Sequence, residues 1–483
     1  MTALRALVLS ALFLGISLHA QKDLVATPTP PMGWNSWDAY GLTITEQQFR
    51  ANVRVLHEKL QPFGYNYAVI DEGWFFENPQ DRETPDKLIY ALDINGRYIP
   101  TASRFPSAGK NGDTLRIIGA VAPKLAATIQ GPQYAGFRPL ADFVHAQGLL
   151  FGIHIVRGIP RASVERNLPI ADSHFTTADA ADTTDACPWD PTNWGVKDTP
   201  AGQAWYDSLI SQYAGWGVDL LKVDCISDHP YKADEIRMIR RAIDKTGRPM
   251  VLSLSPGPTN PSHAQEVAQL ATMWRISDDV WDVFEPALGK DGKPSTWPRP
   301  IVEQFSRAAQ WAALDIPAGH YPDLDMLPFG ELRPAPGWGQ PRTSRLTLDE
   351  KRSMLTLWAM MRSPLIVGAN LTQLDDETLK LLTNKDLIAL DQRPASGRVE
   401  ISNQRDIVTI ETKLTRNGHD AKVMAFCNLN DVPRGIEQNV DFFNDVPEAR
   451  RPAIDLWTGT VIGTARYFHA ALAPHACALV EIQ

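Results

Sequence analysis

The feature that most limits the possible folds is an alternation of short apolar segments with longer amphipathic segments, from about residue 30 to residue 385. Several of the apolar segments are continuous runs, as is typical of parallel strands covered on both faces. Eight segments have the length and composition of strands: 32–36, 67–71, 149–155, 219–225, 249–255, 273–277, 318–321 and 363–369. Segments such as 45–60 and 233–247 lie between them and have helical character. Eight strand–helix repeats predict a single closed (β/α)8 barrel, the TIM barrel.

A different pattern begins after about Asn384. Apolar and polar residues alternate between turn signals, which predicts a C-terminal antiparallel β-sandwich. Its clearest strand candidates are 406–414, 421–429, 453–459 and 477–483. We therefore expect a catalytic barrel over 21–385 and a β-sandwich domain over 386–483. The stretches 77–135 and 156–200 are rich in Gly, Pro, Asp and Thr, and we expect them to form long loops over the C-terminal ends of the strands.

The first residues have the pattern of a secretory signal. A single arginine, Arg5, precedes an apolar run that ends at Leu18, and Ala20 follows at a plausible cleavage position. The run is short for a bilayer span, so we expect a signal peptide over 1–20 and export to a periplasm or beyond the cell, with no membrane contact after cleavage. An uncleaved membrane anchor is the alternative.

Charge and cysteine content exclude some classes of protein. The formal net charge of −9 comes from dispersed acidic residues, which gives no reason to expect a nucleic-acid partner. The four cysteines, at 187, 225, 427 and 477, are too few for a disulfide scaffold and too widely spaced for a structural zinc site. Two disulfides and four buried free thiols are both compatible with the sequence.

Polar and aromatic residues stand where five of the predicted strands end. In a (β/α)8 barrel these ends meet at one rim, where active groups cluster. Any one of them could be an ordinary strand or turn cap, but five converging on one rim are difficult to explain in that way. The residues are Trp37, Asp71, Glu72, His154, Lys222, Asp224, Arg275 and the pair Asp278–Asp279.

These residue types fit the cleavage of a glycosidic bond. One ionised carboxylate attacks the anomeric carbon, a second carboxyl group protonates the leaving oxygen, and tryptophan rings stack on sugars. Lys222 and Asp224 are two residues apart on one strand and share a face, so we expect the Lys222 cation to hold Asp224 ionised as a nucleophile.

The same segments resemble glycoside hydrolase family 27, the α-galactosidase and α-N-acetylgalactosaminidase family. The resemblance runs from about residue 28 to the end of the chain. The matching motifs are TPPMGWNSWDAYG (29–41), GYNYAVIDEGW (64–74), LADFVHAQGLLFGIH (140–154), GWGVDLLKVDC (215–225), WRISDDVWD (274–282), GHYPDLDML (319–327) and SPLIVGANL (363–371).

The resemblance implies a role for each rim residue. Asp224 matches the family's nucleophile, and Asp279 matches its acid/base, with the adjacent Asp278 as the alternative. The sugar-binding positions map to Trp37, Asp71, Glu72, Lys222 and Arg275, and His154 stands where the family has a tyrosine. The family needs no metal and no cofactor. The implied activity is that of a retaining exo-α-glycosidase, with α-galactosidase as the leading assignment and a carbohydrate as the partner molecule.

Three departures from the family pattern concern the sugar rather than the reaction. The second-strand pair is Asp71–Glu72 where the family usually has two aspartates, and Pro256–Gly257 replace its position-2 contact. Cys225 directly follows the nucleophile position, which makes a bridge to Cys187 conceivable.

These departures leave other specificities open: isomalto-dextranase-like, β-L-arabinopyranosidase-like or α-N-acetylgalactosaminidase. A non-catalytic carbohydrate-binding protein and a structural or adhesive role for the sandwich are the alternatives from other classes. Asp323 and Asp325 could be metal ligands, but no third ligand follows at a fixed spacing, so we expect a loop and helix-cap role for them.

Overall fold

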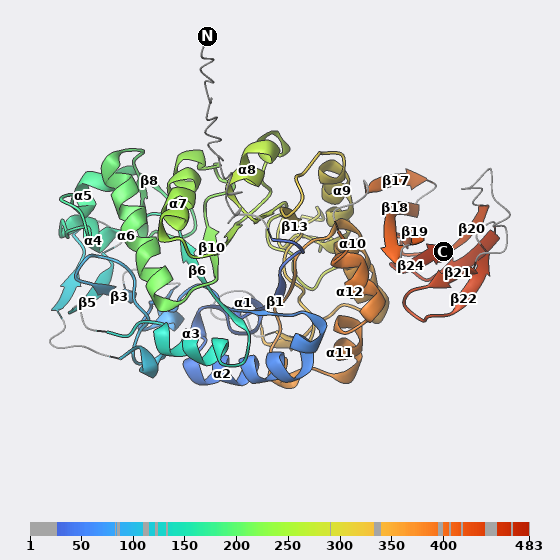
Figure 1. Ribbon diagram of the computed structural model, residues 1–483, viewed down its shortest axis with the longest axis horizontal. Helices are drawn as coiled ribbons and strands as arrows, with labels where there is room; N and C mark the ends of the chain where they lie inside the picture. Colours follow the sequence, from blue (N-terminus) through green and yellow to red (C-terminus); the bar gives the residue numbers. More distant parts are fainter. Residues whose placement is uncertain are drawn as a thin grey trace, which may run out of the picture.

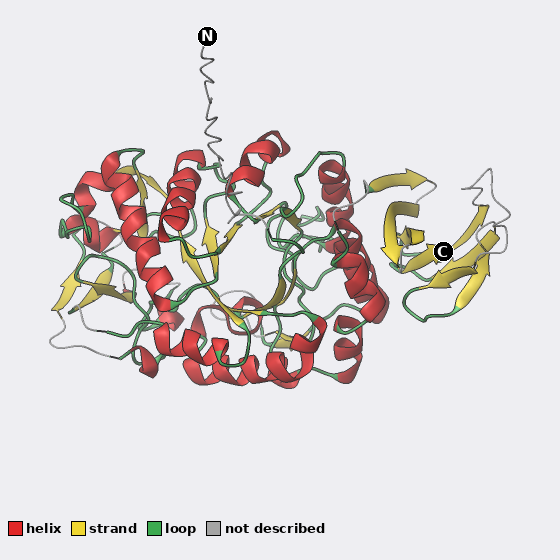
Figure 2. Ribbon diagram, in the orientation of Figure 1, coloured by secondary structure: helices red, strands yellow, loops and turns green. Residues whose placement is uncertain are grey.

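The computed structural model divides into a large α/β barrel and a smaller C-terminal all-β domain beside it (Figures 1 and 2). The structure describes residues 27–482 apart from 83, 85–86, 110–114, 121–123, 132–133, 290, 333–339, 395–398, 405–406, 417–418, 440–451 and 465–466. The predicted signal peptide and residues 406 and 483 of the predicted strands lie outside these residues. No helix among the described residues is long and apolar enough to cross a membrane.

Eight parallel strands form the barrel, and they lie around it in chain order. The barrel closes between the seventh and eighth strands. There Leu327, which follows the seventh strand, forms a parallel β-bridge with Val367 in the eighth. This confirms the predicted (β/α)8 barrel. The strands are β1 (Met32–Asn35), β2 (Tyr67–Ile70), β6 (Leu150–Val156), β10 (Leu220–Asp224), β11 (Val251–Leu254), β12 (Met273–Arg275), β13 (Tyr321–Asp323) and β16 (Leu365–Val367).

One or two helices follow each strand and cover the outside of the barrel (Figure 2). Thr45 begins the first of them with a capping box to Gln48, which satisfies free N–H groups at the helix start. Its helix continues through a π-helical turn at Leu56–Leu60, so the predicted 45–60 segment is helical almost throughout. The covering helices are α2 (Glu46–Val55), α3 (Arg138–His145), α6 (Pro200–Trp216), α7 (Ala233–Thr246), α8 (Ala264–Leu270), α9 (Ile301–Ala312), α10 (Leu348–Met361), α11 (Asp376–Leu382) and α12 (Lys385–Asp391).

The seventh strand lies later in the chain than predicted. The sequence indicated 318–321, whereas β13 occupies Tyr321–Asp323. Gly319 has a φ of 91°, which an extended strand does not contain, so pairing starts only beyond it. The shift matters because it places Asp323 within the strand and Asp325 just past its end.

Both predicted long loops carry small sheets of their own. The first holds β3 (Ile89–Asp93), β4 (Leu115–Ile118) and β5 (Ala126–Gln130), and the second holds β7 (Ile159–Pro160), β8 (Ala181–Ala186) and β9 (Asn193–Val196). Short helices also occur at α1 (Trp37–Tyr40), α4 (Arg161–Glu165) and α5 (Thr177–Ala180), and a hairpin pairs β14 (Glu331–Leu332) with β15 (Arg342–Thr343). These insertions follow β2 and β6, so they stand over the C-terminal rim.

The C-terminal domain is the predicted antiparallel β-sandwich. Its strands are β17 (Glu400–Gln404), β18 (Ile407–Arg416), β19 (His419–Asn428), β20 (Arg434–Asn439), β21 (Pro452–Asp455), β22 (Val461–Thr464), β23 (Tyr467–Leu472) and β24 (Cys477–Ile482). Sequence reasoning missed β17, β20, β22 and β23. A disulfide joins Cys427 on β19 to its direct partner Cys477 on β24. We call residues 400–482 the sandwich domain.

The central strand β19 contributes to two hydrophobic cores. Val423 and Ala425 belong to the core that continues into the barrel, whereas Met424 and Phe426 belong to a separate core within the sandwich domain. Helix α10 is buried along most of its length because the barrel covers one side and the sandwich domain the other. Helix α12 occupies the first residues of the range 386–483 that was predicted for the second domain, and it packs on α10. The boundary between the two domains stays a prediction.

Candidate functional site

All eight residues predicted for the site line one cavity at the C-terminal rim of the barrel. Besides these, the cavity is lined by Asp38, Ser255, Val280, Trp281, Asp325 and Met326. The deep end is closed, with the Asp71 and His154 side chains only 3% exposed, whereas the Asp279 side chain near the mouth is 39% exposed. The barrel therefore places acidic, basic and aromatic groups around one blind pocket.

The register of three neighbouring strands builds the floor of the pocket. Ile70 on β2 pairs with Ile153 on β6, so Asp71 follows beside His154, and His154 pairs in turn with Lys222 on β10. The Nζ of Lys222 donates to Oδ2 of Asp71 at 2.9 Å, and Nε2 of His154 lies 4.0 Å from Oδ1 of Asp71.

Asp71 is held as a carboxylate by this arrangement. Burial alone would raise its pKa, but the Lys222 ammonium and the N–H of Glu72, which donates to Oδ1, hold the pKa of Asp71 well below its ordinary value. The side chain of Asn35 at the end of β1 also donates to Oδ2 at 2.7 Å. A fixed, negatively charged acceptor at the base of a pocket is suited to binding the hydroxyl groups of a sugar.

His154 has the electrostatics of a neutral hydrogen-bonding group. Burial lowers the pKa of its ring, with Lys222 adding to the effect against the pull of Asp71. Its Nδ1 is buried and has no hydrogen-bond partner among the described residues.

The expected partnership between Lys222 and Asp224 is wrong. Lys222 forms its ion pair with Asp71, because Asp71 lies on the same level two strands away. The two oxygens of Asp224 instead accept hydrogen bonds from Nε1 of Trp189, at 3.1 Å, and from Oγ of Ser255, at 3.0 Å. Asp224 is thus oriented by neutral donors on both oxygens.

The loop that carries Trp189 is tied to the strand that carries Asp224. A disulfide joins Cys187 to Cys225, so the open question about these cysteines is answered in favour of the bridge. Cys225 is itself buried and has a φ of 61°. The disulfide therefore keeps the Trp189 indole close to the Asp224 carboxylate, although Trp189 lies in a loop.

Arg275 organises the acidic side of the pocket. Its guanidinium contacts Oδ2 of Asp325 at 2.6 Å and Oδ1 of Asp279 at 3.4 Å. The loop role expected for Asp325 is confirmed in part, because this carboxylate accepts the N–H groups of Met326 and Val280, and it also pairs with Arg275. Asp323, at the end of β13, accepts the N–H of Asp325, as a loop-stabilising residue would.

The alternative acid, Asp278, lies outside the residues that line the pocket. Its carboxylate is 3.6 Å from Arg299, and burial raises its pKa, with the neighbouring Asp279 acting in the same direction. Asp279 is therefore the member of the pair that reaches the cavity.

Glu72 is held from outside the barrel by the first long loop. Its carboxylate forms an ion pair with Arg82, and Arg82 also donates to the backbone oxygen of Trp189 and lies 3.9 Å from Asp190. The Glu72 side chain is only 6% exposed. A longer acidic side chain, fixed at its tip, thus forms part of the pocket wall.

Sequence reasoning missed several residues of the site. Ser255 directly follows β11, so the strand-end rule that identified the others could have found it, and Asp38 stands beside the predicted Trp37. Asp325 lies two residues past β13, a strand that was predicted too early in the chain. Trp189 and Arg82 lie on long loops, and no periodic pattern marks them. The missed residues are Asn35, Asp38, Arg82, Trp189, Ser255, Trp281, Asp325 and Met326.

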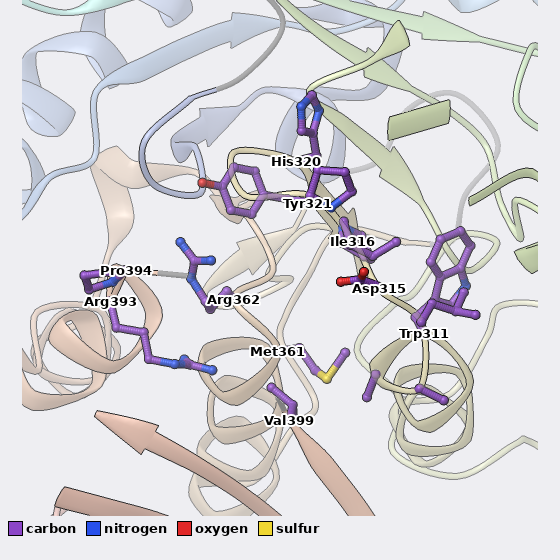
Figure 3. Close-up of a pocket in the computed structure, with 15 residues that line it drawn as sticks. Trp311, Asp315, Ile316, His320, Tyr321, Met361, Arg362, Arg393, Pro394 and Val399 are labelled. Carbon is purple, nitrogen blue, oxygen red and sulfur yellow. The ribbon is translucent and has the colours of Figure 1, made fainter. Parts of the chain in front are cut away.

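A larger cavity of about 550 Å³ lies elsewhere and holds none of the predicted residues (Figure 3). It is formed where α9 and α10 end and β13 begins, so it belongs to the N-terminal face of the barrel. Because residues at that face of a (β/α)8 barrel serve stability, we place the functional site at the rim.

Comparisons with known proteins point in one direction. A family model described as alpha galactosidase A matches residues 192–393. The curated alpha-galactosidase A of Cellvibrio japonicus is 28% identical over 389 residues, which is 80% of this chain and 72% of that protein. The human alpha-N-acetylgalactosaminidase is 23% identical over 457 residues, 91% of this chain and 87% of that protein.

Solved structures match nearly the whole chain. The family 27 β-L-arabinopyranosidase of Geobacillus stearothermophilus is 35% identical, with a TM-score of 0.78 over 95% of this chain and 97% of that one. A variant of that enzyme in complex with arabinose gives a TM-score of 0.80. The α-galactosidase I of Mortierella vinacea, 21% identical with a TM-score of 0.65 over 96% and 98% of the chains, shares the fold.

We predict that replacing Lys222 by methionine destabilises the protein by about 3–5 kcal/mol at pH 7.5, because it leaves the buried Asp71 carboxylate without its cation. In the variant, burial raises the pKa of Asp71 above its unfolded value. The variant therefore binds a proton on folding, and its loss of stability should shrink as the pH falls to 5. Urea unfolding of both proteins at the two pH values measures this.

Two controls accompany the measurement. Lys232→Met removes a partly exposed ion pair with Asp185 and should cost less than about 1 kcal/mol. The double variant Asp71→Asn/Lys222→Met removes both buried charges and should lose the pH dependence. A loss in Lys222→Met that is the same at both pH values would contradict the proposed origin.

Proposed function

Because the chain belongs to glycoside hydrolase family 27, we propose that it is a retaining exo-glycosidase that removes a terminal β-L-arabinopyranosyl residue, with α-D-galactosides as the second candidate substrates. The observation that carries this proposal is the joint presence of Asp224 and Asp279 in one blind pocket whose floor is the Asp71–Lys222 pair. A closed floor and an exposed mouth suit the binding of one terminal sugar.

In the proposed mechanism Asp224 attacks the anomeric carbon. Trp189 and Ser255 donate to its two oxygens and orient the carboxylate. Asp279, at the mouth, protonates the departing oxygen and then removes a proton from the water that releases the sugar. Two displacements at the anomeric carbon return it to its starting configuration.

The identity of the sugar depends on Glu72. A β-L-arabinopyranoside has the ring configuration of an α-D-galactoside but no hydroxymethyl group on C5. Glu72 is one methylene longer than the aspartate expected from the family pattern, and Arg82 fixes its carboxylate in the pocket wall. We infer that this side chain takes the space that a hydroxymethyl group needs.

Two observations weigh on the choice between these sugars. The structural relative at 35% identity over nearly the full length is a β-L-arabinopyranosidase, which supports the first candidate. The alpha-galactosidase family model and the curated relative at 28% identity support α-galactosidase. The reaction is the same in both cases, and a one-carbon difference in the sugar separates them.

We also propose that the protein is exported. The two disulfides among the described cysteines support this, because such bonds persist in oxidising compartments outside the cytosol. N-terminal sequencing of protein collected outside the cytoplasm should begin just after Ala20. A chain that keeps residues 1–20 would contradict cleavage and favour an anchor.

Replacing Asp224 or Asp279 by asparagine should lower kcat by about 10³-fold or more on a glycoside with a sugar leaving group, with the fold preserved by circular dichroism. Asp279→Asn should lose much less on nitrophenyl glycosides, because nitrophenolate departs without a proton. NMR of the first product should show the anomer of the substrate.

Asp278→Asn is the matched control and should keep activity within a few-fold of wild type. If it lost as much activity as expected for Asp279→Asn, the acid role would pass to Asp278. A first product of opposite configuration would contradict the retaining mechanism, and sugar binding without turnover would favour a non-catalytic protein.

Wild-type protein should cleave nitrophenyl β-L-arabinopyranoside with a kcat/KM at least about tenfold above that for nitrophenyl α-D-galactopyranoside. Glu72→Asp should shift this ratio toward the galactoside by about tenfold or more, because it removes one methylene from the pocket wall. Glu77→Asp, an exposed change in the same loop, should leave the ratio unchanged. A wild-type preference for the galactoside would favour α-galactosidase instead.

A further inference from the structure

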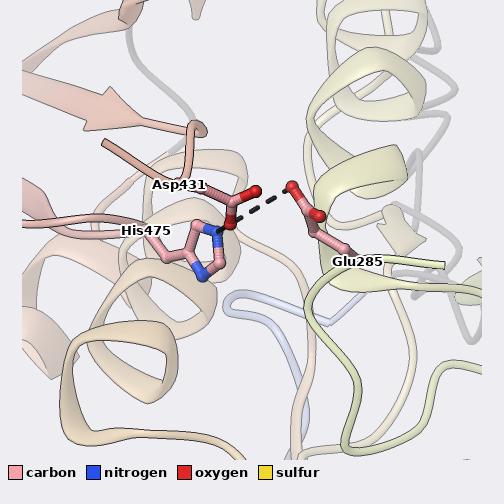
Figure 4. Close-up of side chains that lie close together, drawn as sticks. All are labelled: Glu285, Asp431 and His475. Atoms are coloured by element: carbon pink, nitrogen blue, oxygen red, sulfur yellow. Dashed lines mark hydrogen bonds and ion pairs between the residues drawn. The ribbon is translucent and has the colours of Figure 1, made fainter. Parts of the chain in front are cut away.

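We propose that Glu285, Asp431 and His475 bind a zinc ion that joins the loop after β12 to the sandwich domain. Their ligand atoms, one from each residue, all lie within 4.8 Å of one another. Figure 4 shows the three side chains converging from separate segments, with Glu285 on the barrel side and the other two on the sandwich side. The proposal is independent of the sugar that the rim pocket takes.

The distances within the cluster suit a tetrahedral ion. Nε2 of His475 lies 3.1 Å from Oδ1 of Asp431 and 3.9 Å from Oε1 of Glu285. Zinc bonds of about 2.0–2.1 Å to nitrogen and oxygen at tetrahedral angles place ligand atoms about 3.3 Å apart. The two measured distances lie on either side of this value, so a small rotation of exposed side chains completes the geometry.

The imidazole of His475 is held in the orientation that a metal ligand needs. Its Nδ1 lies 2.8 Å from Oε1 of Glu350, and its ring stacks on Phe284 with the ring centroids 4.2 Å apart. Glu350 is itself fixed as part of the capping box that begins α10. A carboxylate on the far ring nitrogen is the usual outer partner of a metal-bound histidine, because it fixes the tautomer.

On the other side of the ring, Nε2 of His475 faces the carboxylates of Asp431 and Glu285. The three groups converge on one place, where a single cation would contact all of them. Arg345 lines the same hollow, but it donates to Asp282 at 3.0 Å and 3.3 Å. Direct contacts among the three residues would also account for these distances, and the experiment below separates that arrangement from a bound metal.

The donor set favours zinc over the harder cations. One imidazole nitrogen and two carboxylate oxygens suit zinc, whereas calcium and magnesium prefer oxygen ligands alone. The carboxylate side chains of Glu285 and Asp431 are 46% and 76% exposed, so water can reach the fourth position. Zinc is usually four-coordinate, so the three protein ligands and one water molecule would complete its coordination shell.

A metal ion in this cluster would connect two parts of the molecule. Glu285 is in the segment that also contains Asp279, and Val283 and Phe284 of that segment pair with the start of α9. A metal at Glu285 would attach this segment to Asp431 and His475 of the sandwich domain. The sandwich domain would then help to fix the loop that borders the mouth of the pocket.

The test is calorimetric titration of the EDTA-treated, untagged protein with zinc chloride, together with its thermal unfolding midpoint. We expect one zinc ion per chain and a rise in the midpoint of about 2 °C or more at saturating zinc. Calcium chloride should produce neither effect. Glu285→Gln and Asp431→Asn, both at exposed positions, should each weaken zinc binding at least about tenfold and abolish the rise.

Matched controls carry the same chemical changes elsewhere on the surface. Glu58→Gln and Asp172→Asn alter exposed residues outside the cluster and should bind zinc as the wild type does. His475→Asn should also lose binding, although its contacts with Phe284 and Glu350 make it the less clean variant. The proposal is overturned if Glu285→Gln and Asp431→Asn bind zinc as tightly as the controls do, or if the wild type binds none.

Discussion

The buried ion pair between Lys222 and Asp71 is the constraint on which the mouth of the barrel depends. A buried charge without its partner costs several kcal/mol, so β2, β6 and β10 must keep the register that brings the two together. A slip of one residue would turn Lys222 to the other face of its strand. Asp224 stands two residues further along the same strand, so this register also delivers the proposed nucleophile to the pocket.

The parts of the structure that follow from local pattern could be predicted from the sequence. Continuous apolar runs indicated the barrel strands, and the rule that active groups follow parallel strands identified residues such as His154 and Arg275 that do meet in one cavity. The seventh strand was misplaced because Gly319 interrupts extended structure in a way that composition does not reveal. Four strands of the sandwich domain were missed because their alternation is short and weak.

Contacts made by loops could not be predicted in the same way. Trp189 and Arg82 reach the pocket from segments distant in sequence, and their positions depend on a disulfide and on ion pairs that exist only in the folded chain. The partner of Lys222 was misjudged for a related reason: nearness along one strand suggested Asp224, whereas the Lys222 ammonium contacts Asp71, at the same level two strands away. The barrel strands thus supply most of the groups that line the pocket, and the loops add contacts that orient them.

The double use of β19 has a consequence for the removal of the sandwich domain. Alternate residues of β19 pack into two different hydrophobic cores. Removing the sandwich domain would therefore expose buried residues of α10 to solvent. A change that adds or removes this domain would also require different residues on that face of the helix. The barrel and the sandwich domain therefore share one continuous hydrophobic core, and a substitution on either side of their interface affects the packing of the other.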